Sequence, residues 1–240
     1  MPYKIHHFKS LASTQDKAKE LAKKGLSNVV IVADKQTKGR GRFKRKWHSD
    51  KGGLWISILV RPKNTENLQY LTFAAAVAVA KSIKKIANLN TNIKWPNDVH
   101  YQGKKLCGIL TEGIFGKNNF AVVGIGLNAN QNKLPDEIKN TATSLKIIKN
   151  KEIETKKLLK SIAGEFFDLY CKFYNKNQTA KILNMWKKHC DTINKNIEVI
   201  TKTRRLSGKA IGIDKDCNLL LKIKPNKIMK IIEADINIRY

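Results

Sequence analysis

Short apolar runs and helical patterns alternate along the first half of the chain. Runs rich in β-branched and aromatic residues predict strands, at residues 28–33, 54–60, 92–95, 105–111 and 120–128. Apolar residues at spacings of three and four predict helices at 12–26 and 68–86, the first capped by Ser13 with Asp16 three residues later. A turn around 116–119 would join the last two strands. This alternation indicates a mixed sheet with helices on one face, an α/β or α+β core.

The pattern changes in the second half of the chain. An amphipathic helix is predicted over 152–175 and, after a break, continues at 180–189. Short strand-like segments separated by turn signals follow, a pattern typical of small SH3-like or OB-like barrels. We therefore place a boundary near Asp191 and expect a first domain of residues 1–190 and a small barrel of residues 191–240.

A basic loop that contains glycines lies between the predicted strands 28–33 and 54–60. It reads TKGRGRFKRKWHSDKGG, and a loop of this size inside a compact domain tends to be functional. Its glycines allow close backbone approach, and its cations can neutralise phosphate or carboxylate. It is neither a Walker sequence nor the G-x-G-x-x-G dinucleotide fingerprint. On these residues alone, a nucleotide-binding loop and an RGG-like RNA-binding loop both stay open.

Two further segments combine strand ends with polar residues. The segment KWPND ends a strand and places Asn97 and Asp98 in a turn, where their side chains can face a ligand. The next strand begins at Lys105, and its Gly108 leaves room for a ligand against the strand. The segment GIGLN, at the end of strand 120–128, holds glycines that indicate either a bulge or a close backbone approach.

Charge and cysteine content narrow the class of protein. The chain has 240 residues and a formal net charge of +28, which attracts polyanions, but its lysines are spread along the whole length. We therefore interpret the charge as a solvated basic surface. No apolar stretch reaches the ~18 residues of a membrane span, and the N-terminus lacks the apolar region of a secretory signal, so a cytoplasmic protein is expected. The 4 cysteines lack disulfide or metal spacing, which indicates reduced thiols and no protein metal site.

These segments resemble the motifs of one family, the biotin protein ligases (biotin-[acetyl-CoA-carboxylase] ligases). The resembling segments, in the family's order, are Ser13-Thr14-Gln15, GRGRFKRKWHS, KWPND, KLCGILTE and GIGLN. The resemblance implies an α+β catalytic domain, a mixed sheet with helices of the class II aminoacyl-tRNA synthetase-like fold, and a small C-terminal SH3-like β-barrel. The chain begins almost directly at the Ser-Thr segment. We therefore expect no N-terminal helix-turn-helix repressor domain and no specific DNA binding.

The resemblance also implies an activity and its residues. The activity is activation of biotin with ATP to biotinyl-5′-AMP, followed by transfer of biotin to a lysine of a biotin carboxyl carrier domain. Catalytic roles are implied for Lys105, Arg42, Arg40 and Asp98. Biotin binding is implied for Ser13, Thr14, Gln15, Gln36, Arg40, Gly41, Arg42, Lys105 and Gly108. Binding of ATP and the adenylate is implied for Arg42, Arg45, Trp47, Lys105 and Asn128.

The resemblance implies partners as well. Mg²⁺ is expected with the ATP, held largely by phosphates and water, and edge-to-edge pairing of sheets in the family favours a homodimer. Two alternatives stay open. A lipoate or octanoate protein ligase shares the fold and an essential lysine, although the GRGRxxRxW loop together with KWPND favours biotin. A basic RNA-binding protein would use the GRGR loop and the barrel, but it leaves KWPND and KLCGILTE without a role.

Overall fold

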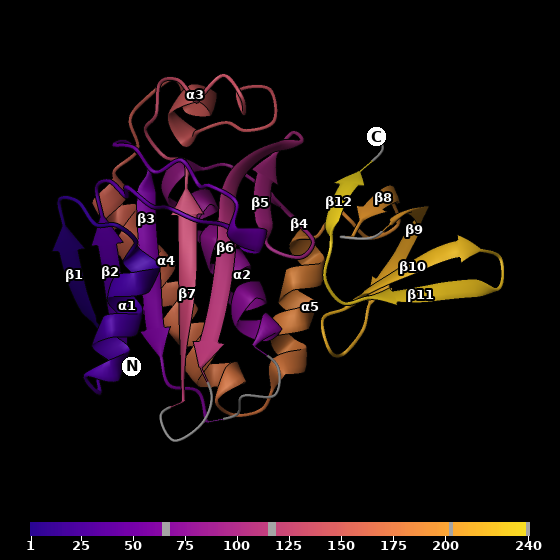
Figure 1. The fold of residues 1–240 in the computed structure, drawn as a ribbon, viewed down its shortest axis with the longest axis horizontal. Helices are drawn as coiled ribbons and strands as arrows, with labels where there is room; N and C mark the ends of the chain where they lie inside the picture. Colours follow the sequence, from indigo (N-terminus) through magenta and orange to yellow (C-terminus); the bar gives the residue numbers. More distant parts are fainter. Residues whose placement is uncertain (64–67, 115–118, 202–203, 239–240) are drawn as a thin grey trace.

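The computed structural model describes residues 1–63, 68–114, 119–201 and 204–238, which form two β-sheets flanked by helices (Figure 1). The first sheet is 7-stranded, in the order β1-β2-β3-β7-β6-β5-β4. Its strands are β1 (Lys4–Phe8), β2 (Val29–Ala33), β3 (Leu54–Val60), β4 (Asn92–Lys94), β5 (Asp98–Tyr101), β6 (Lys104–Ile114) and β7 (Phe120–Leu127). Strand β1 pairs parallel with β2, and the other neighbours pair antiparallel. The predicted mixed sheet is therefore confirmed.

Helices cover both faces of this sheet. The helices are α1 (Thr14–Lys23), α2 (Gln69–Ala87), α3 (Leu145–Lys149), α4 (Thr155–Leu169) and α5 (Thr179–His189). On β2, Val29 and Ile31 pack in the cluster that contains α1, whereas Val30 and Val32 pack in the cluster that contains α2 and α4. The prediction of helices on one face is wrong for α1. Coverage from both sides explains why every residue of β2 and β3 is buried and why all of them except Ser57 are apolar.

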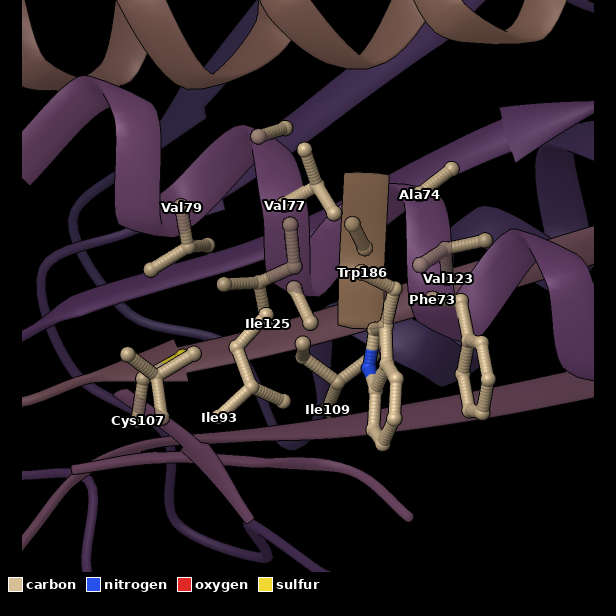
Figure 2. Close-up of a cluster of buried hydrophobic side chains, with 14 of the residues drawn as sticks. Phe73, Ala74, Val77, Val79, Ile93, Cys107, Ile109, Val123, Ile125 and Trp186 are labelled. Carbon is tan, nitrogen blue, oxygen red and sulfur yellow. The ribbon is translucent and has the colours of Figure 1, made fainter. Parts of the chain in front are cut away.

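The main core lies between the sheet and α2 (Figure 2). Residues of α2 such as Val77 pack on Ile109 and Ile125 of the central strands. Helix α5 adds Trp186, whose ring stacks on Phe73 with centroids 4.2 Å apart and planes 8° from parallel. Aromatic stacking adds to the burial of apolar area. This layer of packed side chains supports β5, β6 and β7 from the side of α2.

The second sheet is 5-stranded, in the order β11-β10-β9-β8-β12, which agrees with the small β domain expected from the sequence. Its strands are β8 (Asn196–Ile200), β9 (Arg205–Ile213), β10 (Leu219–Lys224), β11 (Lys227–Ile231) and β12 (Asp235–Ile238). Tyr70 of α2 donates a hydrogen bond to the Lys215 carbonyl oxygen at 2.5 Å. Trp95 Nε1 donates to the Cys217 carbonyl oxygen at 3.0 Å. These bonds, the second of them buried, fix the second sheet beside the KWPND segment.

Several elements differ from the sequence-based expectations. Strands β1 and β5 and the short helix α3 were not predicted, and Asp98 begins β5 instead of lying in a turn. The predicted helix 152–175 ends as an α-helix at Leu169 and continues as a π-helical turn over Tyr170–Tyr174. Residues 116–118 of the predicted turn lie outside the described residues. In the part of the chain that the structure describes, no helix has the length and apolarity to cross a membrane.

Candidate active site

A cavity of about 980 Å³ is lined by the basic loop, by strands of the first sheet, and by β12 with the residue before it. Every residue that the sequence assigned to the site lies on its wall: Ser13, Thr14, Gln15, Gln36, Arg40, Gly41, Arg42, Arg45, Trp47, Asp98, Lys105, Gly108 and Asn128. The residues expected to bind biotin and those expected to bind the adenylate therefore share one cavity. This is the geometry that a reaction between two bound substrates needs.

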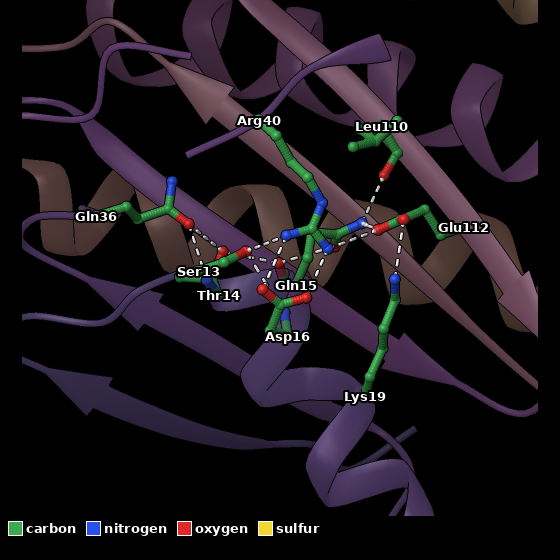
Figure 3. A network of polar contacts seen from close by, with 10 residues as sticks. Ser13, Thr14, Gln15, Asp16, Lys19, Gln36, Arg40, Leu110 and Glu112 are labelled. Atoms are coloured by element: carbon green, nitrogen blue, oxygen red, sulfur yellow. Dashed lines mark hydrogen bonds and ion pairs between the residues drawn. The ribbon is translucent and has the colours of Figure 1, made fainter. Parts of the chain in front are cut away.

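A network of buried polar side chains fixes the start of α1 (Figure 3). The backbone N–H and the hydroxyl of Thr14 both donate to Gln36 Oε1, at 2.8 and 3.0 Å. Ser57 Oγ on β3 lies 2.8 Å from Thr14 Oγ1 and 2.9 Å from Gln15 Oε1. Buried polar groups that satisfy one another have little rotational freedom. The network thus holds polar groups on the cavity wall in one arrangement, as recognition of a polar ring requires.

Arg40 ties the basic loop to α1 (Figure 3). Its Nη1 and Nη2 donate to the two carboxylate oxygens of Asp16 at 2.8 and 2.6 Å, and Nη2 lies 3.5 Å from Glu112. The hydrogen bond from Arg40 holds the pKa of Asp16 below its usual range, and the same bond raises the pKa of Arg40. Because the pKa of Asp16 is lowered on folding, this contact stabilises the loop above the ordinary carboxyl pKa and is lost as the pH falls through the lowered value.

The other loop arginines reach the second sheet. Arg42 Nη1 donates to Asn97 Oδ1 at 3.1 Å, and its Nη2 lies 3.3 Å from Glu233 Oε1. Arg45 pairs with Asp235, at the start of β12. The side chain of Arg42 is only 15% exposed, so its charge is used inside the site and not at the surface. The loop is therefore closed over the cavity by contacts with the KWPND segment and with the second sheet.

Lys105 lies beside both an acid and an aromatic ring. Its Nζ lies 2.7 Å from Asp98 Oδ1 and 5.2 Å from the centroid of the Trp47 ring. The side chains of Lys105 and Asp98 are about one third and one fifth exposed, 33% and 22%. A lysine on a flexible stem with one carboxylate partner can turn toward an anion that enters the cavity. The Asp98–Lys105 pair is thus a movable cation next to a potential base.

The indole ring of Trp47 lies in a seat formed by Gly108 of β6 and Gly126 of β7, where any larger residue would crowd the ring. A Cβ atom at Gly126 would lie 2.4 Å from Trp47 Nε1, and one at Gly108 would lie 3.1 Å from the same indole ring. Strand β7 pairs with β3 and β6 without a register shift through this region. Of the two expectations for GIGLN, the bulge is wrong and the close approach is confirmed. The missing side chains let the indole approach the sheet closely at the cavity wall.

Backbone bonds place the two remaining residues. Gly41 donates its N–H to the Arg45 carbonyl oxygen at 2.8 Å, which closes the turn at the tip of the loop. Asn128 donates its N–H to the Leu106 carbonyl oxygen at 2.9 Å, and its Nδ2 donates to the Thr143 carbonyl oxygen at 3.1 Å. Asn128 therefore also holds the segment around Thr143 next to the end of β7, at the cavity wall.

Comparisons with known proteins agree with this geometry. The models of the "Biotin/lipoate A/B protein ligase family" and the "Biotin protein ligase C terminal domain" match residues 7–130 and 192–239. The bifunctional ligase/repressor BirA of Bacillus subtilis (strain 168) is 39% identical over 235 residues, 95% of this chain and 72% of that protein. The biotin protein ligase from Aquifex aeolicus, solved in complex with biotin and ATP, has a TM-score of 0.86 at 30% identity, and the match covers 98% of each chain. The chain belongs to the biotin protein ligases.

The described residues that line the cavity of this ligase provide groups suited to bind a carboxylic acid and a nucleotide. Arg42 and Lys105 present cations to the cavity, and the seat of Trp47 provides an aromatic face. Trp47 Nε1 is buried and has no hydrogen-bond partner among the described residues, so it is a donor left for another group. Gly108 and Gly124 keep the cavity floor free of side chains, since a Cβ atom at Gly124 would lie 3.0 Å from Gln15.

Sequence reasoning missed several residues that complete the site of the ligase. Asp16 and Glu112 compensate Arg40, and Glu233 and Asp235 hold the other loop arginines. Ser57 completes the network around Thr14. Glu112 stands at the end of the motif KLCGILTE, which was a signal available in the sequence. Glu233 and Asp235, at the entry to β12, carry no motif, so only their position in the fold identifies them.

Replacing Gly126 with alanine is expected to raise the KM for ATP about 10-fold, because an overpacked site costs about 1–3 kcal/mol and the indole of Trp47 must leave its seat. The measurement is steady-state pyrophosphate exchange at varied ATP and at varied biotin. Gly164→Ala is the matched control, since a Cβ atom there meets nothing within 4 Å. An unchanged KM for ATP in Gly126→Ala would contradict the role of this seat.

Proposed function

We propose that this ligase joins biotin to one lysine of a biotin carboxyl carrier domain in two half-reactions. In the first, a carboxylate oxygen of biotin attacks the α-phosphorus of ATP, the bond to pyrophosphate breaks, and biotinyl-5′-AMP forms. In the second, the lysine amine of the carrier attacks the carbonyl carbon of this mixed anhydride. The bond to AMP then breaks, the amine proton passes to a base, and an amide remains.

The cations of the cavity would carry the first half-reaction. Two anions have to approach each other, and negative charge develops around the α-phosphate, so fixed positive groups lower the barrier. Lys105 would leave Asp98 and bridge the biotin carboxylate and the α-phosphate. Arg42 would clamp the phosphate, and Arg45 would add charge at the mouth. Arg40 would hold the loop over biotin from its position between Asp16 and Glu112.

The buried polar network would recognise the ring of biotin. Ser13, Thr14, Gln15 and Gln36 would bind the ureido group, whose N–H and C=O groups need both acceptors and donors. Gly41 and Gly108 would allow the backbone to approach the biotin chain closely. Trp47 would face the adenine, with Asn128 near the phosphates. In the second half-reaction Asp98 would orient or deprotonate the acceptor amine.

The observation that carries the proposal is the convergence of Lys105 and Arg42 with the Thr14–Gln36 network on one cavity. The test is biotin-dependent exchange of labelled pyrophosphate into ATP by the purified chain, with lipoate as the parallel acid. Exchange with biotin alone is expected. Exchange driven by lipoate would make lipoate the substrate. No exchange with either acid would contradict the proposal and favour the alternative of an RNA-binding protein.

Magnesium would enter with ATP. Among the described residues no group of three or more His, Cys, Asp or Glu side chains could hold a metal ion. Mg²⁺ keeps several waters and binds mainly through phosphates in such sites, so it would neutralise the phosphate oxygens of ATP. The protein would contribute its arginines and lysines around that complex.

Association with the carrier is expected to slow as salt is added. Carrier domains of this kind are often acidic, and this chain carries a net charge of +28. Opposite net charges accelerate encounter at low ionic strength, where the screening length is long. The association rate constant kon, measured by stopped flow between about 20 and 500 mM salt, should fall roughly 10-fold. A kon that does not change with salt would mean that the charge does not steer this partner.

The remaining assignments concern organisation and assembly. We propose a catalytic domain of residues 1–190, a C-terminal domain of residues 191–240, and a homodimer formed through a sheet edge. Outer strands present unpaired backbone groups that a second copy can complete.

A cytoplasmic location and the absence of specific DNA binding are part of the same proposal. Sedimentation of the purified chain with biotin and ATP, and gel shift with its own promoter DNA, are the corresponding tests.

A further inference from the structure

Asp98 has a second lysine directly across the sheet. In the pairing of β4 with β5, Lys94 stands opposite Asp98, and Asp98 stands opposite Gly108 of β6. Residues opposite each other in antiparallel strands point to the same face, with Cβ atoms roughly 4.5–5.5 Å apart. Lys94 and Asp98 both line the cavity. Asp98 therefore has Lys94 as its cross-strand neighbour and Lys105 as its ion-pair partner, at 2.7 Å.

Lys94 is a cation without a partner in the described part of the chain. Its ammonium group forms no hydrogen bond or ion pair there, although the residue is half-buried and its backbone pairs within the sheet. Burial lowers the pKa of Lys94, and the charge of Lys105 adds to that shift. The charge of Asp98 opposes it, followed by those of Asp191 and Asp235. Partial burial of an ammonium group that has no ion-pair partner destabilises the folded protein. We therefore expect Lys94 to find its partner in another state of the reaction. Its flexible stem can bring Nζ to a neighbouring carboxylate when that carboxylate becomes free.

We propose that Lys94 is a positioning residue that replaces Lys105 as the partner of Asp98 when Lys105 turns to the substrate anions. It then holds the Asp98 carboxylate in place for the attack of the acceptor amine. This inference rests on the proposed function, because it assumes that Lys105 serves adenylation and Asp98 serves transfer. Arg42 cannot take this place, because its guanidinium is bound to Asn97 and Glu233.

The two half-reactions separate this role from a structural one. In Lys94→Met, which keeps the length of the side chain and removes its charge, single-turnover transfer from preformed biotinyl-AMP should fall about 10-fold. Pyrophosphate exchange should stay within about twofold of the parent, because Lys105 and Arg42 are untouched. Lys94→Arg should recover most of the transfer rate. Lys104→Met is the matched control, since Lys104 is an exposed lysine at the start of β6, next to Lys105.

The coupling to Asp98 provides a second criterion. Residues that act through one another give non-additive effects, so Lys94→Met should add little to Asp98→Asn. The inference is overturned if Lys94→Met lowers exchange as much as transfer, if Lys94→Arg is no better than Lys94→Met, or if the effects of Lys94→Met and Asp98→Asn add in full. Exchange by the parent enzyme tests the proposed function by itself, so failure of the two is distinguishable.

A crystal structure of Lys105→Ala provides a readout that needs no activity. This variant removes the present partner of Asp98 and so imitates the departure of Lys105. We expect Lys94 Nζ within hydrogen-bond distance of the Asp98 carboxylate, about 3 Å. A Lys94 side chain turned away from Asp98 in that structure would overturn the inference, whatever the activity of the parent.

Discussion

Replacing Lys105 with alanine is expected to abolish biotin-dependent pyrophosphate exchange while the protein stays folded. Lys105 is the cation next to Asp98 and the face of Trp47, where the proposed chemistry occurs. Removal of one electrostatic group that acts at the transition state typically costs about 10²–10³ in rate, and more where the group bridges both reactants. Its partly exposed ion pair contributes little to folding, about 1 kcal/mol or less. The measurements are exchange rate and thermal unfolding of parent and variant.

A neighbouring lysine provides the control for Lys105→Ala. Lys104 is exposed at the start of the same strand, and Lys104→Ala should keep the exchange rate of the parent. If Lys105→Ala loses exchange and also unfolds several degrees lower, the loss of activity has a structural cause. If Lys105→Ala exchanges pyrophosphate at nearly the parent rate, Lys105 does not have the assigned role.

Replacing Arg42 with glycine is expected to release biotinyl-AMP and to permit labelling of unrelated proteins. The side chain binds Asn97 Oδ1 at 3.1 Å, the Ala234 carbonyl oxygen at 3.2 Å and Glu233 at 3.3 Å. Its loss therefore frees the loop from the KWPND segment and from the second sheet, and also removes the proposed phosphate clamp. Hydrogen bonds to charged groups contribute about 1.5–3 kcal/mol each, so dissociation should accelerate roughly 10- to 100-fold.

The release can be measured in two ways. Rapid filtration gives the rate at which labelled biotinyl-AMP leaves the enzyme, and a streptavidin blot of bystander albumin shows unselective labelling. Lys44→Gly is the matched control, since Lys44 lies in the same turn with a φ of 59°, which glycine adopts without strain. Lys44→Gly should retain the intermediate. Retention by Arg42→Gly at the rate of the parent would show that the clamp lies elsewhere.

Strong local signals explain the parts of the fold that the sequence predicted. The run LWISILV is β3, and the helix predicted at 12–26 is α1 with Ser13 as its N-cap. Strand β1 has no such signal, because its sequence KIHHF is mostly exposed. Its strand conformation depends on parallel pairing with β2. Strand β5 is short and begins with a charged residue, so its extended form depends on β4 and β6.

The residue types of the site were predictable, but their partners were not. The resemblance to the biotin protein ligases assigned Arg42 and Lys105 to one site, and cations suit a reaction between two anions. One partner of Arg42 is Glu233, which is 191 residues away along the chain. No periodicity or turn signal connects residues so far apart. Their contact depends on how the second sheet packs beside the first.

By itself, the sequence determined the apolar runs, the family motifs and the residue types that meet phosphate and carboxylate, because these are local properties of the chain. Only the tertiary structure decided that α1 covers the opposite face of the sheet from α2, and that Glu233 and Asp235 close the arginine loop. It alone left Lys94 beside Asp98 without a partner of its own. Each of these features depends on packing between distant segments, where burial and charge compensation act on groups that chain order does not bring together.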